Sequence, residues 1–266
     1  IVDGVKSVLP EADFDVIDLK MANILSSDLA YYGGCRAHAC WGSFVAAPVK
    51  TLATRRLDFS TPFPSALHHV MCAWDPDDGS VRWVNMGWPG MVTAVTAVNA
   101  YGTQVSTHDF GGASIYEGVV PRVVATRYVL TGMGAIPVGE HLAWVRTELD
   151  AIDVATSSFL NYFAPEGAGG VFTCAQGGSC GQLRVPQDDY FSGEVLITTN
   201  SQTTGHQVPA GGQFMHDYYE EGSPKDIEGH FELMGTSGLH LVSVAYRGYE
   251  DMTILAHGRG RSDLIR

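Results

Sequence analysis

The chain has 266 residues, of which 45% are hydrophobic and 17% are charged, so it can bury a sizeable core and is not a disordered polymer. Its 16 Lys and Arg residues against 29 Asp and Glu residues leave a formal net charge of −13. Such a surface repels phosphate backbones and anionic headgroups, which argues against a nucleic-acid partner or a polybasic membrane contact. No apolar run reaches the roughly 18 residues of a membrane-spanning helix.

The chain begins with a segment that differs in character from the rest. A helix is predicted near Ile17–Tyr31, and Gly33-Gly34 would end it. From Cys35 onward the sequence changes to short β-like runs separated by Gly, Pro and Asp. We therefore expect residues 1–34 to form an N-terminal segment and residues 35–266 to form one domain.

Short strands and two helices are predicted in the remainder of the chain. The strands expected after residue 60 are, in chain order, Ala66–Trp74, Val81–Met86, Val92–Asn99, Gln104–Thr107, Gly170–Ala175, Glu194–Thr199, His240–Tyr246 and Met252–His257. The helices lie between the fourth and fifth of these, one after Pro121 and one near Gly139–Leu149. Tight turns such as Asp75–Gly79 favour hairpins. This order predicts an α+β layered domain on antiparallel strands, not a doubly wound parallel sheet.

Five cysteines are present, and an odd number leaves at least one thiol free if all bridges are internal. They are Cys35, Cys40, Cys72, Cys174 and Cys180. Cys174 and Cys180 flank a Gly-rich turn, and the sequence leaves open whether they form a disulfide. The low lysine content, the acidic surface and this potential bridge lean toward an exported protein.

No pattern of metal ligands stands out. The chain has no CxxC pair and no HExxH motif, and its acidic residues Asp188-Asp189, Asp217 and Glu220-Glu221 lack calcium-loop spacing. We interpret these acidic residues as solvated loop charge, and we expect no metal and no cofactor.

The candidate nucleophiles are Cys35 and Cys40, because a thiol is partly ionised near neutral pH and is intrinsically reactive. Cys35 directly follows a Gly-Gly pair, and Cys40 precedes Trp41-Gly42-Ser43. A thiol alone is weak support, since buried free cysteines are common and inert. The residues around the two cysteines give stronger support.

Several sequence blocks occur in the order seen in one superfamily of enzymes. They are Gly34-Cys35, Trp41-Gly42-Ser43, Arg55-Arg56-Leu57-Asp58-Phe59, the stretch Gly87–Gly102, Leu196–Asn200 and Leu239–Val244. Together they resemble the N-terminal nucleophile (Ntn) amide hydrolases, and among these the penicillin-acyltransferase-like and choloylglycine-hydrolase-like group. Arg56 and Phe59 depart from the pattern, in which Asn and Trp are usual.

The resemblance implies a four-layer αββα sandwich with the nucleophile at the start of a central strand. It also implies self-cleavage between Gly34 and Cys35, which would give Cys35 a free α-amine beside its thiol. An α-amine ordinarily has a pKa of about 7.7–8.0 and can therefore act as a general base near neutral pH. The spacing to the Trp-Gly-Ser block favours Cys35 over Cys40, and Cys40 would then be a core residue.

The resemblance also implies roles for four further residues. Arg55 would place a positive charge near the thiolate and favour its ionisation. Asp58 would accept a hydrogen bond from the amine, and Asn99 and Asn200 would donate to the oxyanion of the tetrahedral intermediate. Simpler interpretations stand beside these: Arg55 and Asp58 could be a surface ion pair, and Asn99 could be a turn residue.

The function expected from this resemblance is a self-processing cysteine amidohydrolase that cleaves a linear C–N amide bond through a thioester. Its partners would be a small-molecule amide and its own cleaved N-terminal segment; the sequence does not reveal whether it forms a homo-oligomer. Apolar residues, namely Phe59, Phe63, Trp88 and Met91, indicate an apolar acyl group. The alternatives are an acyltransferase using the same thioester, a non-catalytic binding protein on the same fold, and a papain-like protease using Cys40, which the hairpin order disfavours.

Overall fold

The structure is a computed structural model, and it describes a large part of the chain. The described residues are 2–8, 10–11, 13, 15–28, 35–57, 70–87, 90–113, 119–175, 177–191, 193–201, 207–234, 239–245, 252–258 and 261–265. Among them, no helix combines the length and the apolar character needed to cross a bilayer. The predicted helix near Ile17–Tyr31 is present as α2 (Val16–Asp28), whereas residues 29–34 lie outside the described residues.

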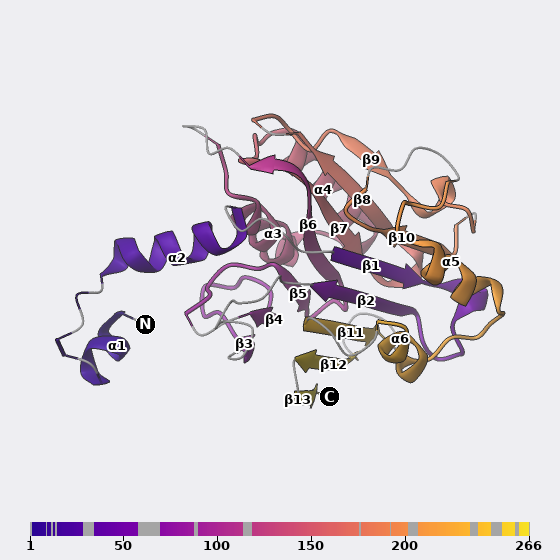
Figure 1. Ribbon diagram of the computed structural model, residues 1–266, viewed down its shortest axis with the longest axis horizontal. Coiled ribbons are helices and arrows are strands. Elements are labelled where there is room, and N and C mark those ends of the chain that lie inside the picture. Colours follow the sequence, from indigo (N-terminus) through magenta and orange to yellow (C-terminus); the bar gives the residue numbers. More distant parts are fainter. Residues whose placement is uncertain are drawn as a thin grey trace.

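Two antiparallel sheets form the centre of the molecule (Figure 1). The first sheet has the order β10-β1-β2-β11-β12-β13 and the second β3-β4-β5-β6-β7-β8-β9. The strands of the first sheet are β1 (Cys35–Cys40), β2 (Thr51–Leu57), β10 (Val195–Thr198), β11 (Leu239–Ala245), β12 (Met252–Gly258) and β13 (Arg261–Ile265). Those of the second sheet are β3 (Val70–Trp74), β4 (Trp83–Gly87), β5 (Thr96–Asn99), β6 (Gln104–Ala113), β7 (Thr156–Phe163), β8 (Gly169–Cys174) and β9 (Gln182–Arg184).

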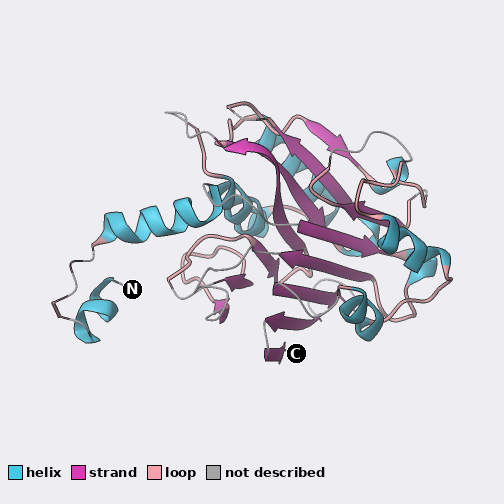
Figure 2. Cartoon of the chain, viewed as in Figure 1, coloured by secondary structure: helices cyan, strands magenta, loops and turns pink. Residues whose placement is uncertain are grey.

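Helices cover the outer faces of both sheets, as Figure 2 shows in cyan. They are α3 (Arg122–Thr131) and α4 (His141–Asp150) on the second sheet, and α5 (Gln213–Glu220) and α6 (Ile227–Leu233) on the first. Apolar side chains of the two sheets meet between them, for example Ala37 and Leu196 from the first sheet with Phe163 and Val171 from the second. The expected α+β sandwich with αββα layering is therefore confirmed.

The Trp-Gly-Ser block at the end of β1 ties the two sheets together. Trp41 is buried, and its Nε1 donates to Ala164 O beyond the end of β7 at 2.7 Å. Gly42 has a φ of +55°, and a Cβ there would collide with the side chain of Glu194. Ser43 donates to both carboxylate oxygens of Glu194, which fixes the turn. This block is therefore structural, and its spacing from Cys35 is set by the length of β1.

One asparagine anchors the N-terminal segment to the domain. In Figure 1, α1 (Val2–Val8) lies apart from the sheets, while α2 reaches the domain beside α3. Asn23 of α2 is buried; its Nδ2 donates to Gly90 O at 3.0 Å, and its Oδ1 accepts from the backbone N–H groups of Val92 and Thr93 at 2.8 and 3.3 Å. These contacts satisfy both ends of one buried amide.

The hairpin around Asp75–Gly79 is confirmed as β3 and β4, and the two helices after it as α3 and α4. The elements that the sequence analysis did not predict include α1, β7, β9, β13, α5 and α6. The interpretation of Asp189 as solvated loop charge is wrong, because it is 1% exposed and forms an ion pair with Arg184 at 2.6 Å. Its carboxylate also accepts from Ile197 N at 3.0 Å, which joins β9 to β10. Asp217 and Glu220 are solvated but belong to α5, not to a loop.

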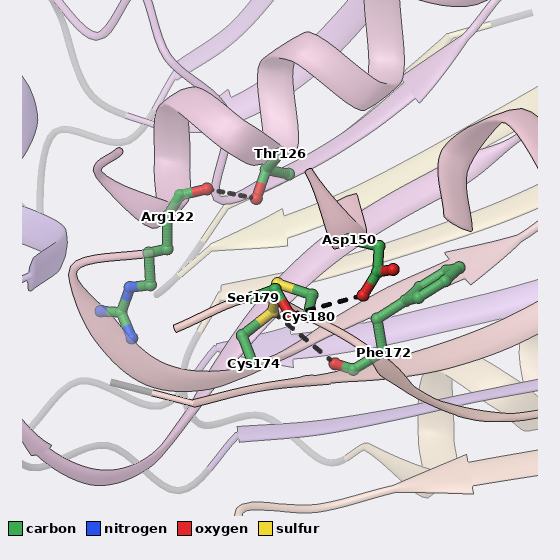
Figure 3. The surroundings of a disulfide bond; sticks show 7 residues. All are labelled: Arg122, Thr126, Asp150, Phe172, Cys174, Ser179 and Cys180. Carbon is green, nitrogen blue, oxygen red and sulfur yellow. Dashed lines mark hydrogen bonds between the residues drawn. A yellow bond between two sulfur atoms is a disulfide. The ribbon is translucent and has the colours of Figure 1, made fainter. Parts of the chain in front are cut away.

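Cys174 and Cys180 form a disulfide, which resolves the alternative that the sequence left open (Figure 3). The bond closes the turn that leaves β8 and keeps it against the end of α4, where Cys180 N donates to Leu149 O at 3.1 Å. Cys35, Cys40 and Cys72 are free thiols.

Replacing Asp189 with Asn should lower the free energy of unfolding by about 3 kcal/mol, because it leaves the mostly buried Arg184 guanidinium without its charged partner. Urea denaturation measures this change. The control is Glu166→Gln, which breaks the solvent-exposed pair with Lys50 and should cost less than about 1 kcal/mol. Equal losses in both variants would contradict the importance of the buried pair.

Candidate active site

The pairing of β1 with its two neighbours determines what surrounds Cys35. On one side, Ala37 pairs with Thr198, and continuing this antiparallel register by two residues sets Asn200 opposite Cys35. On the other side, Cys35 pairs with Leu57, so Arg55 is its diagonal neighbour on β2, within reach of a long side chain. The register alone therefore brings an amide and a guanidinium to the first residue of β1.

The side chains complete this arrangement. Arg55 Nη2 lies 3.1 Å from Cys35 Sγ, and the same nitrogen donates to Thr107 O on β6 at 2.8 Å. The backbone N–H of Cys35 donates to Asn200 Oδ1. The thiol and the backbone nitrogen of one residue are thus held by two different side chains from the flanking strands.

The guanidinium of Arg55 is fully buried, with a side chain among the largest that the structure encloses completely. A buried charge is costly unless it is hydrogen-bonded or paired. A positive charge in this position can stabilise negative charge on the sulfur, and low-dielectric surroundings strengthen such an interaction relative to water. The arrangement therefore suits a nucleophilic thiolate.

Apolar side chains form the remaining surroundings of Cys35. The residues that pack with it in one buried cluster are Leu57, Met86, Met91, Val95, Val98 and Val123, with Met71 and Val84 at the edge. Of the four residues expected to line an apolar mouth, Met91 lies in this cluster, while Phe59, Phe63 and Trp88 lie outside the described residues. Val84 and Val98 also line a cavity of about 860 Å³ at the hairpin end of the second sheet.

Cys40 lies on the opposite face of β1 from Cys35. It packs against Leu52, Met215 and Tyr219 under α5, and its Sγ lies 3.7 Å from His230 Nε2. Burial raises the pKa of the Cys40 thiol to about 12, so this sulfur is protonated at neutral pH. The geometry therefore favours Cys35 as the nucleophile.

Two predicted site residues are not brought to Cys35 by the described structure. Asn99 faces the outer side of β5, where its Nδ2 donates to Leu130 O at 3.0 Å and its Oδ1 accepts from Tyr101 N and Thr103 N at 3.0 and 3.2 Å. These contacts match the simpler interpretation of Asn99 as a turn residue. Asp58 lies outside the described residues.

The structure adds His108 to the surroundings of Arg55, and the sequence analysis missed it. It is fully buried on β6, one residue beyond the carbonyl that Arg55 contacts. A usable signal existed, because His108 falls in the alternating run that starts at Gln104, and a histidine on the inward face of a central strand is unusual in a core.

A second polar cluster lies beneath α5 and α6. His38 Nδ1 and Tyr219 Oη are 2.6 Å apart, Tyr219 Oη lies 3.3 Å from His230 Nε2, and Thr54 Oγ1 lies 2.7 Å from His230 Nδ1. Burial lowers the pKa of His38 to about 3. These groups hydrogen-bond mainly to one another and lie on the face of the sheet away from Cys35, so we assign them to the stability of the helical layer.

Within the described part of the chain, one group of residues has the spacing of metal ligands. On α5, His216 Nδ1 lies 3.7 Å from both Asp217 Oδ1 and Glu220 Oε2. This cluster lies in the helical layer outside the first sheet, on the far side of that sheet from Cys35.

Comparison with solved structures identifies the fold. No protein-family model matches the chain, and no curated protein sequence matches it. An ortholog of N-acylethanolamine-hydrolyzing acid amidase from Caenorhabditis elegans superposes with a TM-score of 0.57 and 11% identity, over 78% of this chain and 92% of that one. Penicillin V acylase from Agrobacterium tumefaciens gives a TM-score of 0.51 and 14% identity, over 86% and 84%. The fold is that of the Ntn hydrolases, as the resemblance implied.

The free energy of unfolding should fall as the pH drops from about 6.5 toward 3. His38 titrates near 6.5 when unfolded and at about 3 when folded, so acid favours the unfolded chain over this interval. One such group contributes a slope of about 1.4 kcal/mol per pH unit. His38→Asn keeps a hydrogen-bonding group near Tyr219 but does not titrate. Urea denaturation at pH 6, 5 and 4 should therefore show that the unfolding free energy of this variant falls less steeply with decreasing pH, by about 1.4 kcal/mol per pH unit. Identical slopes for the two proteins would refute this assignment.

Proposed function

We propose that this protein is a self-processing cysteine amidohydrolase that cleaves a linear C–N amide bond of a small acyl-amide through a thioester on Cys35. The observation that carries the proposal is the pair of contacts at one residue. Arg55 Nη2 lies against the thiol at 3.1 Å, and Asn200 Oδ1 accepts from the backbone nitrogen that would become the α-amine.

Hydrolysis would proceed in two halves. The α-amine of Cys35 takes the thiol proton, and the sulfur attacks the amide carbon to form a tetrahedral oxyanion. Collapse of this intermediate breaks the C–N bond, and the leaving amine takes the proton from the ammonium group. Water then attacks the thioester carbon and gives a proton to the amine; the acid departs, and the thiol regains its proton.

The surrounding residues support these steps in different ways. Arg55 stabilises the thiolate, and the carbonyl oxygen of Asn200 orients the amine so that its lone pair faces the thiol. We assign the Nδ2 group of Asn200 to the oxyanion, a contact whose loss typically costs about a hundredfold to a thousandfold in rate. Asp58 keeps its proposed role as a second acceptor for the amine, and Asn99 is left out of the set.

Self-processing would expose the amine. The Cys35 thiol attacks the carbonyl carbon of Gly34, the acyl group moves from nitrogen to sulfur, and water hydrolyses the resulting thioester. The products are a carboxylate on Gly34 and a free amine on Cys35. A glycine before the nucleophile suits this step, because it tolerates backbone angles that other residues avoid.

The acyl part of the substrate is proposed to be apolar. Met86, Met91 and Val98 pack around Cys35, and a charged acyl group would be desolvated there without a partner. The structures of the same fold are named for an N-acylethanolamine-hydrolyzing amidase and for an acylase of penicillin V, which supports an acyl-amide as the substrate class.

Cys35→Ala should abolish hydrolysis of fatty-acyl, aryl-acyl and penicillin amides, whereas Cys40→Ala should keep a rate within a few fold of the wild type. The reason is that Cys40 lies protonated on the far face of β1. Product release measured by mass spectrometry, with and without an added amine acceptor, separates hydrolysis from acyl transfer. Loss of activity in Cys40→Ala with retention in Cys35→Ala would contradict the proposal, as would a wild-type protein inactive on the whole panel.

Intact-mass analysis should find the mature protein as two chains, residues 1–34 and 35–266, that co-migrate on gel filtration. Asn23 explains the association, because it makes several hydrogen bonds across the junction of α2 and residues 90–93. Asn23→Ala should release the short chain, while the exposed control Lys20→Ala should not. A single uncut chain with full activity would contradict self-processing.

A further inference from the structure

Three side chains with metal-ligating atoms converge on α5. His216 Nδ1 lies 3.7 Å from Asp217 Oδ1 and 3.7 Å from Glu220 Oε2, and the three atoms all lie within 4.8 Å of one another. Residues four positions apart on a helix are neighbours on its surface, which brings Glu220 beside His216. This helical spacing differs from that of a calcium loop, so the search for calcium-loop spacing in the sequence could not reveal it.

The separations are too long for hydrogen bonds but fit a shared cation. A nitrogen–oxygen hydrogen bond spans about 2.7–3.2 Å. A zinc ion binds nitrogen and oxygen at about 2.0–2.2 Å in a tetrahedron, so its ligand atoms lie about 3.3–3.6 Å from one another. The side chains of Asp217 and Glu220 are 57% and 51% exposed, so they have room to make the small adjustment that remains.

The burial of His216 is an independent observation that points to a ligand. The residue is 5% exposed, and neither of its ring nitrogens makes a hydrogen bond to any described residue. Its ring packs against Tyr190 and Phe191, with centroids 4.3 and 5.2 Å away, and these contacts hold the imidazole in place. Burying such a polar group without a partner is costly, and an ion on Nδ1 would give that nitrogen one.

The surroundings of the three ligands favour a positive ion. Two carboxylates face one imidazole, and Glu220 is the last residue of α5, where the backbone carbonyls of a helix attract cations. Gln213, one turn earlier, donates from Nε2 to Asp217 Oδ1 at 2.6 Å. This bond orients the carboxylate and leaves it with lone pairs for a metal, as hydrogen bonds behind metal ligands commonly do.

We propose that His216, Asp217 and Glu220 form a zinc-binding site, with water as the fourth ligand. One imidazole nitrogen with two carboxylate oxygens suits Zn²⁺, whereas Mg²⁺ and Ca²⁺ prefer oxygen ligands alone. The ion would stabilise α5, which packs Tyr219 over Cys40. The site lies on the far side of the first sheet from Cys35, so the inference is independent of the proposed function.

The test measures Zn²⁺ bound to the full chain by equilibrium dialysis, and the midpoint of thermal unfolding with and without Zn²⁺. Asp217→Asn and Glu220→Gln each remove one ligand charge at nearly constant shape, on exposed side chains. His216→Phe keeps an aromatic ring but removes both nitrogens. The matched control is Glu221→Gln, which removes the same charge one residue beyond the end of α5.

The wild type and Glu221→Gln should each bind one more Zn²⁺ per chain than the three ligand variants do. Each ligand variant should weaken this binding by more than about tenfold, the lower end of the range for residues that only support a ligand. Glu221→Gln should change it less than about threefold. Zinc should also raise the unfolding midpoint of the wild type and of Glu221→Gln more than that of the ligand variants, because an ion that binds only the folded state stabilises it.

Three results would overturn the proposal. They are equal zinc uptake by the wild type and Glu220→Gln, no zinc uptake by the wild type, and displacement of the bound zinc by an equal concentration of Ca²⁺. Zinc held by the free thiols of Cys35 and Cys72 would stay in every variant, so it does not alter the comparison. If His216→Phe does not fold, the two carboxylate variants decide the outcome.

Discussion

The antiparallel register of β1 between β10 and β2 is the constraint on which the site depends. It sets Asn200 opposite Cys35 on one side and Arg55 diagonally across on the other. Because side chains alternate with a period of two, a slip of one residue would turn Cys35 into the helical layer and His38 toward the second sheet. The same register that buries Ala37 and Leu196 between the sheets thus also brings Arg55 and Asn200 to Cys35.

The two faces of β1 give its two cysteines opposite chemical characters. Cys35 shares a layer with a guanidinium, whereas Cys40 shares one with aromatic rings and neutral imidazoles, where burial raises the pKa of its thiol to about 12. This difference does not come from sequence neighbours, since only five positions separate the two residues on one short strand. It comes from an odd spacing, which places them on opposite faces, and from what each face packs against.

Sequence patterns predicted well those features that depend on neighbours along the chain. The hairpin at Asp75–Gly79 follows from turn chemistry. The burial of Asp189 could not be predicted in this way. Its partner Arg184 is close in the sequence, but both side chains are held by the backbone of Ile197 in the other sheet, which no local pattern reveals. Asn99 shows the same limit. The sequence block places it at the end of a strand, but only the packing of α3 shows that its amide points to the outer face of the sheet, where it donates to Leu130 O.

The burial of Arg55 fits the proposed reaction better than a role in stability alone. Replacing a buried charged group and its partners with well-packed apolar residues is often neutral or stabilising, so a core selected only for stability has little reason to enclose a guanidinium. Here the guanidinium lies against the thiol of Cys35, the residue whose backbone N–H also donates to Asn200 Oδ1. A guanidinium at Cys35 among apolar neighbours suits the proposed reaction, in which an anionic sulfur is stabilised and an uncharged acyl group is accepted.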